Sequence, residues 1–313
     1  MAKRPPTKRP TGAKRPPVPA KRGRPAGLFT WLAVGLVVIV VAGLVIIKLA
    51  GGSAAPNAKG GFSAASPAVV AELTHIPATV FNTVGVTSPV AQVTPPQALA
   101  GQPALTATSA SGATLPEVFY YGAEYCPYCA AQRWPTIIAL SRFGTFKGLG
   151  NMSSSSSDFA GTPTFTFINA TYTSKYLVFK SIEAESNVFD SATGSWVPLQ
   201  KPTAAQQALF VKYDSSKYVT GYTAQDDGSI PFISLGNKFL VAGASYTPAT
   251  LANLSRNEVA SGLSEATNPV TQAIITSANE QTAALCTLTK QQPGNVCSSS
   301  GVTAAKKSMG LIS

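Results

Sequence analysis

The longest uninterrupted apolar stretch of the chain lies near its beginning. Residues 28–47 contain no charged side chain, and Trp31 lies near their first end, where an aromatic residue suits a membrane interface. Nine basic and no acidic residues precede this stretch within residues 1–27, and Lys48 follows it. The pattern predicts one transmembrane helix over residues 28–49, with the N-terminus in the cytoplasm and the rest of the chain exported.

A cleaved signal peptide is the alternative interpretation of this segment, and small residues after Lys48 would suit a cleavage site. The apolar stretch is longer than the roughly 7–15 residues of a signal peptide, so we expect an uncleaved anchor in the lipid bilayer. The proline-rich basic residues 1–27 predict a disordered cytoplasmic tail, with docking of a partner as a second role. Residues 50–66, rich in Gly, Ala and Ser, predict a flexible linker.

Alternating and helical patterns then predict an exported α/β domain over residues 67–300, followed by a C-terminal tail over 301–313. Strand patterns lie at 117–122, 164–168, 176–182, 230–235 and 238–241, and the last two are joined by a tight Gly-Asn turn. Helical patterns lie at 66–73, 127–143, 203–213, 247–258 and 268–286. The hydrophobic periodicity of residues 76–115 does not distinguish short edge strands from an ordered loop. Residues 144–157 predict a loop, and residues 170–226 predict an insertion.

The charge of the chain is concentrated at its N-terminus. Of the 24 lysines and arginines, nine lie within residues 1–27, which leaves 15 basic residues against 13 acidic ones in the remainder. The exported part is therefore nearly neutral, and we expect no nucleic-acid partner. The single histidine, His75, has no cysteine or acidic cluster close to it in the sequence, so we interpret it as a surface or packing residue.

The most specific chemical motif is Cys126-Pro127-Tyr128-Cys129, at the junction of a predicted strand and a predicted helix. A cysteine at a helix N-terminus faces free backbone N–H groups and the positive end of the helix dipole, and both favour the thiolate. Pro127 suits the first helical position, and a cysteine three residues on is close enough to form a disulfide. A bridge across so short a loop is easily reduced, so the motif predicts a redox-active pair.

Two other roles stay open for this pair, namely an inert short disulfide and half of a zinc site. Zinc needs two further ligands, and Cys286 and Cys297 do not have the usual close spacing, so we expect no metal and no other cofactor. All four cysteines follow the predicted membrane segment, where disulfides persist. Cys286 and Cys297 therefore predict a structural disulfide, with a relay pair that exchanges with Cys126 as the alternative.

The order of these elements resembles the thioredoxin fold. The resemblance implies an α/β fold with a central mixed sheet flanked by helices, here with an insertion and a preceding transmembrane helix. In that family a cis-proline beside the active disulfide opens the C-terminal hairpin, and Pro231 in Ser229-Ile230-Pro231-Phe232 matches it. The resemblance implies that the backbone of Ile230 pairs with an extended substrate.

The resemblance also implies a role for each cysteine. Cys126 would be the exposed nucleophile and Cys129 the buried resolving thiol. Thioredoxins carry a buried acid six residues before the first cysteine, and Tyr120 stands there in this chain. A proton relay for Cys129 must then come from Glu124 or from water. Tyr128 makes the dipeptide of the motif similar to that of glutaredoxins. Two neighbours of the motif, Arg133 and Trp134, are interpreted as helix-surface or packing residues.

A second likeness is closer. The segments 117–134 and 139–144 are similar to domain-of-unknown-function family 929, and the likeness covers roughly residues 66–300. That family is described as thioredoxin-like and brings no established substrate, so the resemblance implies a fold more than a function.

We therefore expect a membrane-anchored extracytoplasmic thiol–disulfide oxidoreductase of the oxidase or isomerase kind, acting through Cys126 and Cys129. Its expected partners are exported cysteine-containing proteins and, by analogy with the family, a quinone-linked membrane redox protein that recycles the site. The alternative is a non-catalytic thioredoxin-fold binding module, or a structural envelope protein with two structural disulfides.

Overall fold

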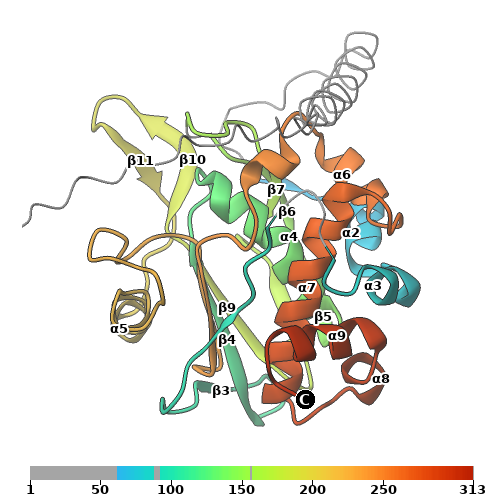
Figure 1. The fold of residues 1–313 in the computed structure, drawn as a ribbon. Helices are drawn as coiled ribbons and strands as arrows, with labels where there is room; N and C mark the ends of the chain where they lie inside the picture. The colour runs from blue at the N-terminus through green and yellow to red at the C-terminus, as the bar shows by residue number, and fades with distance from the viewer. Residues whose placement is uncertain (1–61, 88–91, 156, 313) are drawn as a thin grey trace, which may run out of the picture. The chain divides into compact units, whose positions relative to one another are not determined.

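A mixed β-sheet flanked by helices forms the centre of the protein (Figure 1). The computed structural model describes residues 62–87, 92–155 and 157–312. The predicted cytoplasmic tail, the predicted transmembrane helix and most of the predicted linker lie outside these residues. Within the described ranges, no helix combines the length and the apolar character that crossing a membrane requires.

Strand β4 (Thr114–Gly122) is the middle strand of the sheet, and it leads directly into the cysteine motif. It pairs in parallel with β9 (Val178–Glu183) and antiparallel with β12 (Phe232–Leu235), which confirms three of the predicted strands. The sheet is completed by β13 (Phe239–Ala242), β2 (Gln97–Ala98) and β3 (Thr106–Thr108). The predicted turn at Gly236-Asn237 joins β12 to β13, and both of its residues have positive φ angles, 62° and 51°.

Successive residues of β4 point to opposite faces of the sheet, and both faces are covered. Val118 and Tyr120 belong to the larger hydrophobic core, on the side of helices α4 (Pro127–Ser141) and α7 (Pro269–Leu288). Phe119 belongs to a smaller core on the other side, with Phe210 of helix α5 (Ala204–Tyr213). Because both faces of the strand are buried, its sequence is a continuous apolar run without alternating polar residues.

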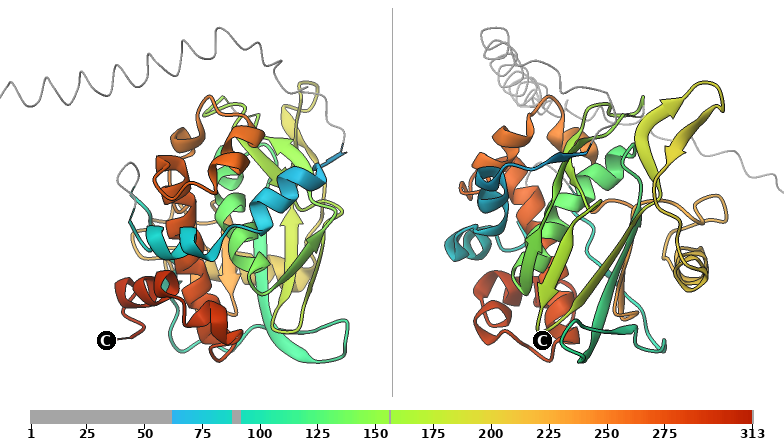
Figure 2. Two further views of the ribbon diagram at one scale, coloured as in Figure 1. Left: turned by 90° about the vertical axis from the view of Figure 1, so that its right-hand side faces the viewer. Right: turned by 180° about the vertical axis from the view of Figure 1, so that it is seen from behind.

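Most helices lie on one side of the sheet, and α5 lies on the other (Figure 2). Helix α4 (Pro127–Ser141) packs against α7 (Pro269–Leu288), the longest helix that the structure describes. Around these two lie α2 (Pro67–Thr74), α3 (Ala78–Val84), the 3₁₀ helix η1 (Pro248–Leu251), α6 (Arg256–Gly262), α8 (Gly294–Cys297) and α9 (Ser300–Ser308). The helix predicted over 247–258 is in fact two separate helices, η1 and α6.

Helix α4 continues through Pro135, which leaves one backbone carbonyl without its helical partner. That carbonyl belongs to Ala131, and the hydroxyl of Tyr246 donates a hydrogen bond of 2.8 Å to it. The tertiary structure thus satisfies the group that the proline leaves free, and the cysteine motif is carried on an intact helix.

Further short strands lie before α4, between α4 and β9, and after β9. They form a three-stranded sheet of β1 (Ser63–Ala64), β6 (Gly150–Ser153) and β7 (Pro163–Thr166), a pair of β5 (Gly144–Lys147) and β8 (Thr171–Ser174), and a hairpin of β10 (Glu185–Asp190) and β11 (Ser195–Pro198). The prediction of a loop over 144–157 is therefore wrong for β5 and β6. β1 lies in the stretch predicted as linker.

Two predicted boundaries also differ from the structure. The predicted insertion over 170–226 contains β9, which is a strand of the central sheet, so the added part begins only at the β10–β11 hairpin. The predicted tail over 301–313 contains most of α9, which packs against α7 through buried Val302 and Ala305. The packed domain therefore continues beyond residue 300.

Candidate redox site

The cysteine motif lies at the end of β4 and the beginning of α4, as the sequence predicts. Cys126 is the N-cap residue of α4 and has extended backbone angles, while Pro127 occupies the first turn. The Cys126 sulfur accepts a hydrogen bond of 3.3 Å from the backbone N–H of Cys129. The sulfur thus takes the place of the side-chain oxygen that usually caps a helix, where backbone N–H groups stabilise negative charge.

Both cysteines of the motif are free thiols in the structure. Hydrogen bonding from the Cys129 side chain lowers the pKa of Cys126 despite its burial, and the Cys129 backbone N–H and the Arg133 cation act in the same direction. Burial raises the pKa of Cys129 well above its usual value. These opposite shifts make Cys126 the better nucleophile and Cys129 the thiol that stays protonated.

Cys126 is less accessible than the sequence led us to expect. Its exposed fraction is 5%, against 0% for Cys129, so the expectation of an exposed nucleophile is wrong for this structure. One cause is the segment before β12, since the backbone carbonyl of Ile230 lies 3.7 Å from the Cys126 sulfur. The peptide bond between Ile230 and Pro231 is cis, as the resemblance to thioredoxins implied.

A buried ion pair lies beneath the motif. Arg133, four residues after Cys129 on α4, donates hydrogen bonds of 2.9 and 2.5 Å to the carboxylate of Glu183 at the end of β9. It donates another, of 2.8 Å, to the carbonyl of Ala123. Both charged side chains are fully buried. The interpretation of Arg133 as a helix-surface residue is therefore wrong, while Trp134 is a fully buried packing residue.

Tyr120 occupies the position where thioredoxins have an acid, and it lies next to this ion pair. The Arg133 guanidinium is 5.7 Å from the centre of the Tyr120 ring. The Tyr120 hydroxyl is buried, and no hydrogen-bond partner for it exists among the described residues. Burial raises the pKa of Tyr120 well above its usual value, so the hydroxyl stays neutral. It therefore cannot act as the base that a carboxylate would provide beside Cys129.

Glu124, the predicted proton relay, lies two residues before Cys126 and is 5% exposed. Its backbone N–H is bound by the carbonyl of Glu185 on β10, at 2.8 Å. Burial raises the pKa of the Glu124 carboxyl, which a hydrogen bond with Thr166 partly offsets. A carboxyl group with a raised pKa is suited to give and take protons near neutral pH, and its role as a relay stays a prediction.

Aromatic side chains surround the motif on two sides. Tyr125 stacks on Trp196 of β11 with ring centres 4.7 Å apart, and Phe189 of β10 packs edge-on against the same tryptophan. Tyr128, inside the motif, contacts the ring of Phe159. Phe189, Tyr128 and Phe159 are 53%, 40% and 36% exposed. Sequence reasoning missed this surface because the hairpin that completes it lies more than fifty residues after the motif.

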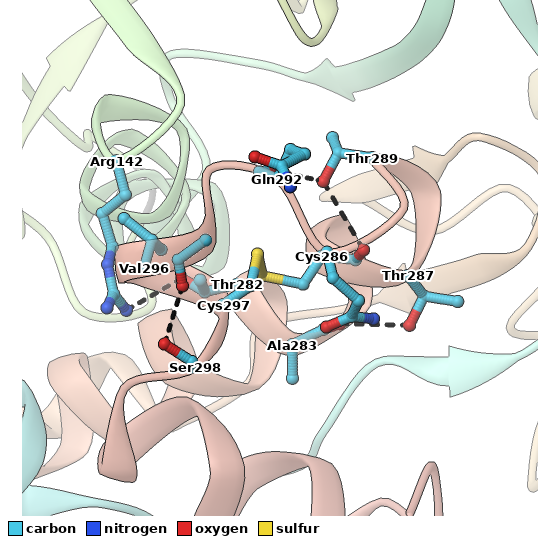
Figure 3. The surroundings of a disulfide bond; sticks show 12 residues. Arg142, Thr282, Ala283, Cys286, Thr287, Thr289, Gln292, Val296, Cys297 and Ser298 are labelled. Carbon is cyan, nitrogen blue, oxygen red and sulfur yellow. Dashed lines mark hydrogen bonds between the residues drawn. A yellow bond between two sulfur atoms is a disulfide. The ribbon is translucent and has the colours of Figure 1, made fainter.

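The second cysteine pair forms the predicted disulfide. Cys286, near the end of α7, is bonded to Cys297, the last residue of α8, with a Cα–Cα distance of 5.6 Å (Figure 3). Because Cys286 and Cys297 are bonded to each other, they are not available to complete a zinc site with Cys126 and Cys129. Within the ranges that the structure describes, no group of three or more His, Cys, Asp or Glu side chains could hold a metal ion.

The sole histidine, His75, is exposed at the end of α2, and its ring forms hydrogen bonds with Thr74 and Ala71 of the same helix. Its position agrees with the interpretation as a surface residue, and it is not part of the candidate site at the cysteine motif.

Comparison with known proteins identifies one family. Residues 106–287, more than half of the chain, match the family described as a domain of unknown function, DUF929. The matched region contains β4, the cysteine motif, Arg133, Glu183 and the segment around Pro231. No curated protein and no solved structure gives a significant match. The chain therefore belongs to the DUF929 family.

Proposed function

We propose that this DUF929 protein is a membrane-anchored, extracytoplasmic thiol–disulfide oxidoreductase with a thioredoxin-like fold. One observation carries the proposal: the Cys126 sulfur caps helix α4 opposite the backbone carbonyl of Ile230. A nucleophilic sulfur with a lowered pKa and a neighbouring backbone acceptor can both react with a substrate disulfide and hold the substrate chain. Cys129, buried one turn away, acts as the resolving thiol.

The exchange proceeds in two steps. A substrate thiolate attacks the Cys126 sulfur of the oxidised Cys126–Cys129 pair, which forms a mixed disulfide and releases Cys129 as a thiolate that takes up a proton. A second substrate thiolate then attacks the substrate sulfur, which completes the substrate disulfide and releases the Cys126 thiolate. Two electrons pass from the substrate to the pair. A quinone-linked membrane oxidant, by analogy with the thioredoxin family, would then remove these two electrons from the pair.

The topology supports a thioredoxin-like fold. The motif follows the middle strand β4, the crossover from α4 returns to β9 parallel to β4, and the antiparallel pair β12–β13 follows the cis-proline. The long helix α7 then packs against α4.

The site supports an oxidase or isomerase more than a fast reductase. A lowered pKa of Cys126 stabilises the reduced pair as its thiolate form, and stabilising the reduced form makes a disulfide more oxidising. Tyr120 replaces the acid that would deprotonate Cys129 during reduction of a substrate. Both features favour electron flow from the substrate to the protein.

An extracytoplasmic location is supported by the second disulfide and by the apolar stretch at residues 28–47. Disulfides form and persist in exported proteins and are rare in the cytosol. The expected substrates are exported cysteine-containing proteins, and the exposed aromatic side chains beside the motif suit apolar segments of unfolded chains.

Trapping of substrates in the native host tests the proposal. In the full-length Cys129→Ala variant, the Cys126 thiolate can still attack a disulfide of an exported protein, which forms a mixed disulfide and releases a substrate thiolate. Cys129 is no longer present to attack this mixed disulfide, so exported proteins should accumulate bound to Cys126. The matched control is Cys126→Ala, which should trap nothing. An absence of mixed disulfides in Cys129→Ala, in protein shown to be at the membrane, would contradict the proposed function.

A non-catalytic binding role is the second candidate, and the small exposure of Cys126 favours it. At 5% exposure, a substrate disulfide reaches the sulfur only if the surrounding segments move. In this case the exposed aromatic side chains of Phe189, Tyr128 and Phe159 would bind partner proteins without disulfide exchange. The wild-type protein would then fail to exchange disulfides with glutathione.

A further inference from the structure

A cavity lies at the opposite end of α4 from the cysteine motif. It has a volume of about 200 Å³ and lies between the end of α4, the helices α2 and α3, and α8. Its lining is mostly apolar, with side chains that include Leu73, Ile76, Phe81, Ile138 and Val296. Ile76 and Val296 are partly exposed, and Ala78 at the rim is exposed, so the cavity can be reached from solvent.

Arg142 lines this cavity and lacks a carboxylate partner. The ion pairs of Arg133 with Glu183 and of Lys180 with Glu117 do not involve it, and no carboxylate among the described residues affects its pKa. The Arg142 guanidinium instead donates hydrogen bonds of 3.1–3.3 Å to three neutral oxygens, of Asn279, Thr282 and Ser299. Its central carbon lies 4.2 Å from the centre of the Phe81 ring.

Such an arginine is costly to bury even in part, because neutral acceptors replace only part of its hydration. Burial lowers the pKa of Arg142 to about 10, so the group remains charged at neutral pH. Three hydrogen bonds use fewer than the five N–H groups that a guanidinium carries. Donors are therefore left for a ligand.

A second polar group in the cavity also lacks a partner. The hydroxyl oxygen of Ser141 is buried, and none of the described residues forms a hydrogen bond with it. Ser141 precedes Arg142 in the chain and lines the same cavity. The lining also contains the polar residues Thr74, Asn295 and Ser299 beside its apolar side chains. A hydroxyl and a guanidinium that both have free hydrogen-bonding capacity, next to apolar side chains, define a site for a ligand with one anionic end.

We propose that this cavity binds a small monocarboxylate whose carboxylate pairs with Arg142 and whose apolar body contacts the side chains of Phe81, Ile138 and Val296. Guanidinium groups pair with carboxylates through two parallel hydrogen bonds. An apolar cavity of about 150 Å³ holds a benzene ring, so this cavity accommodates a molecule of the size of benzoate. Inorganic phosphate or sulfate suits it less, since polar oxygens surround such anions on all sides.

The structural disulfide holds one wall of this site. Val296 precedes Cys297, and the bond to Cys286 ties α8 to the end of α7, with Arg142 nearby (Figure 3). The disulfide therefore stabilises the position of a cavity-lining residue. The proposed site lies apart from Cys126, so it does not depend on the proposed function.

Benzoate and its neutral analogue benzamide are the probes for this site. Binding of each to the full-length protein in detergent is measured by calorimetry and by NMR, for wild type and for Arg142→Gln. The matched control is Lys147→Gln, which removes one positive charge on β5, away from the cavity. We expect wild type and Lys147→Gln to bind benzoate equally, and both Arg142→Gln with benzoate and wild type with benzamide to be at least about 10-fold weaker.

Three results would overturn the proposal: no binding of benzoate at tens of millimolar, equal binding of benzoate and benzamide, or unchanged binding in folded Arg142→Gln. If Arg142→Gln does not fold, the Nε–H resonance of Arg142 in the wild-type protein tests whether benzoate binds at this arginine. It should shift on addition of benzoate and stay in place with benzamide, and a resonance that responds to neither probe contradicts the site.

Discussion

The backbone carbonyl of Ile230 lies 3.7 Å from the sulfur of Cys126, although 104 residues separate them in the chain. The pairing of β12 with β4 produces this contact, because Phe232 lies opposite Tyr121 and so brings the preceding residues to the start of α4. The same strand pairing therefore positions both the proposed nucleophile and the backbone group proposed to bind the substrate.

The reactivity of Cys126 should depend on pH in a manner set by its lowered pKa. Because only the thiolate is alkylated, the rate of its reaction with iodoacetamide should reach half its maximum below the roughly 8.5 of an ordinary cysteine. Cys129, whose pKa is raised by burial, should react only at higher pH. Mass spectrometry of alkylated peptides distinguishes the two. A midpoint for Cys126 at or above 8.5 would show that its environment does not stabilise the thiolate.

Breaking the ion pair of Arg133 and Glu183 should destabilise the protein strongly. Arg133→Met or Glu183→Gln alone leaves one buried charge without its partner, at a cost of about 3–5 kcal/mol in the free energy of unfolding. The double variant should cost clearly less than the sum of the two, measured by urea unfolding. Simple additivity would mean that the two charges do not stabilise each other.

The same variants separate stability from chemistry. Arg133→Met removes the cation that lowers the pKa of Cys126, so the alkylation midpoint should move to higher pH. Trp134→Phe, a buried neighbour without charge, is the control and should lower stability without moving this midpoint.

Removal of the second disulfide should affect stability and spare exchange. The double variant Cys286→Ser/Cys297→Ser should lose about 2–4 kcal/mol of unfolding free energy and show a lower melting temperature. Its rate of disulfide exchange with glutathione should equal that of wild type at a temperature where both are folded. Loss of exchange in the folded variant would instead assign this pair a relay role.

The exposed ring of Phe189 should favour substrates with apolar residues next to the reacting cysteine. Phe189→Ser should lower kcat/KM for a peptide disulfide flanked by aromatic residues by about 5- to 10-fold, and should leave exchange with glutathione disulfide unchanged. Val211→Ser, at an apolar residue on α5 that is 61% exposed, is the matched control. An equal loss of kcat/KM for the peptide disulfide and for glutathione disulfide would indicate that Phe189→Ser damages the cysteine site itself and does not remove a substrate-binding surface.

Local signals in the sequence were sufficient for the centre of the site. The strand before Cys126, the proline at the start of α4 and the turn between β12 and β13 each depend on a few consecutive residues, and the structure contains all three. The helix α9 was missed because Lys306 and Lys307 make its residues look polar, although one face of it is buried against α7.

The ion pair beneath the motif could not be predicted, because it depends on the register of distant strands. Glu183 lies below Arg133 only because β9 pairs in parallel with β4 and places Glu183 opposite Gly122. Nothing in the sequence near Arg133 indicates a carboxylate fifty residues away. The burial of Cys126 was missed for a similar reason, since the covering segment at Ile230 is brought there by β12.

The central claim, that Cys126 and Cys129 form a redox-active pair, is tested most directly by equilibrium titration of the full-length protein in glutathione buffers. The state of the pair is followed by alkylation and mass spectrometry, with Cys126→Ala as the control. We predict one two-electron transition to a Cys126–Cys129 disulfide, at a potential less negative than the roughly −270 mV of thioredoxin. Thiols that stay reduced throughout, or a midpoint at or below that value, would contradict the account.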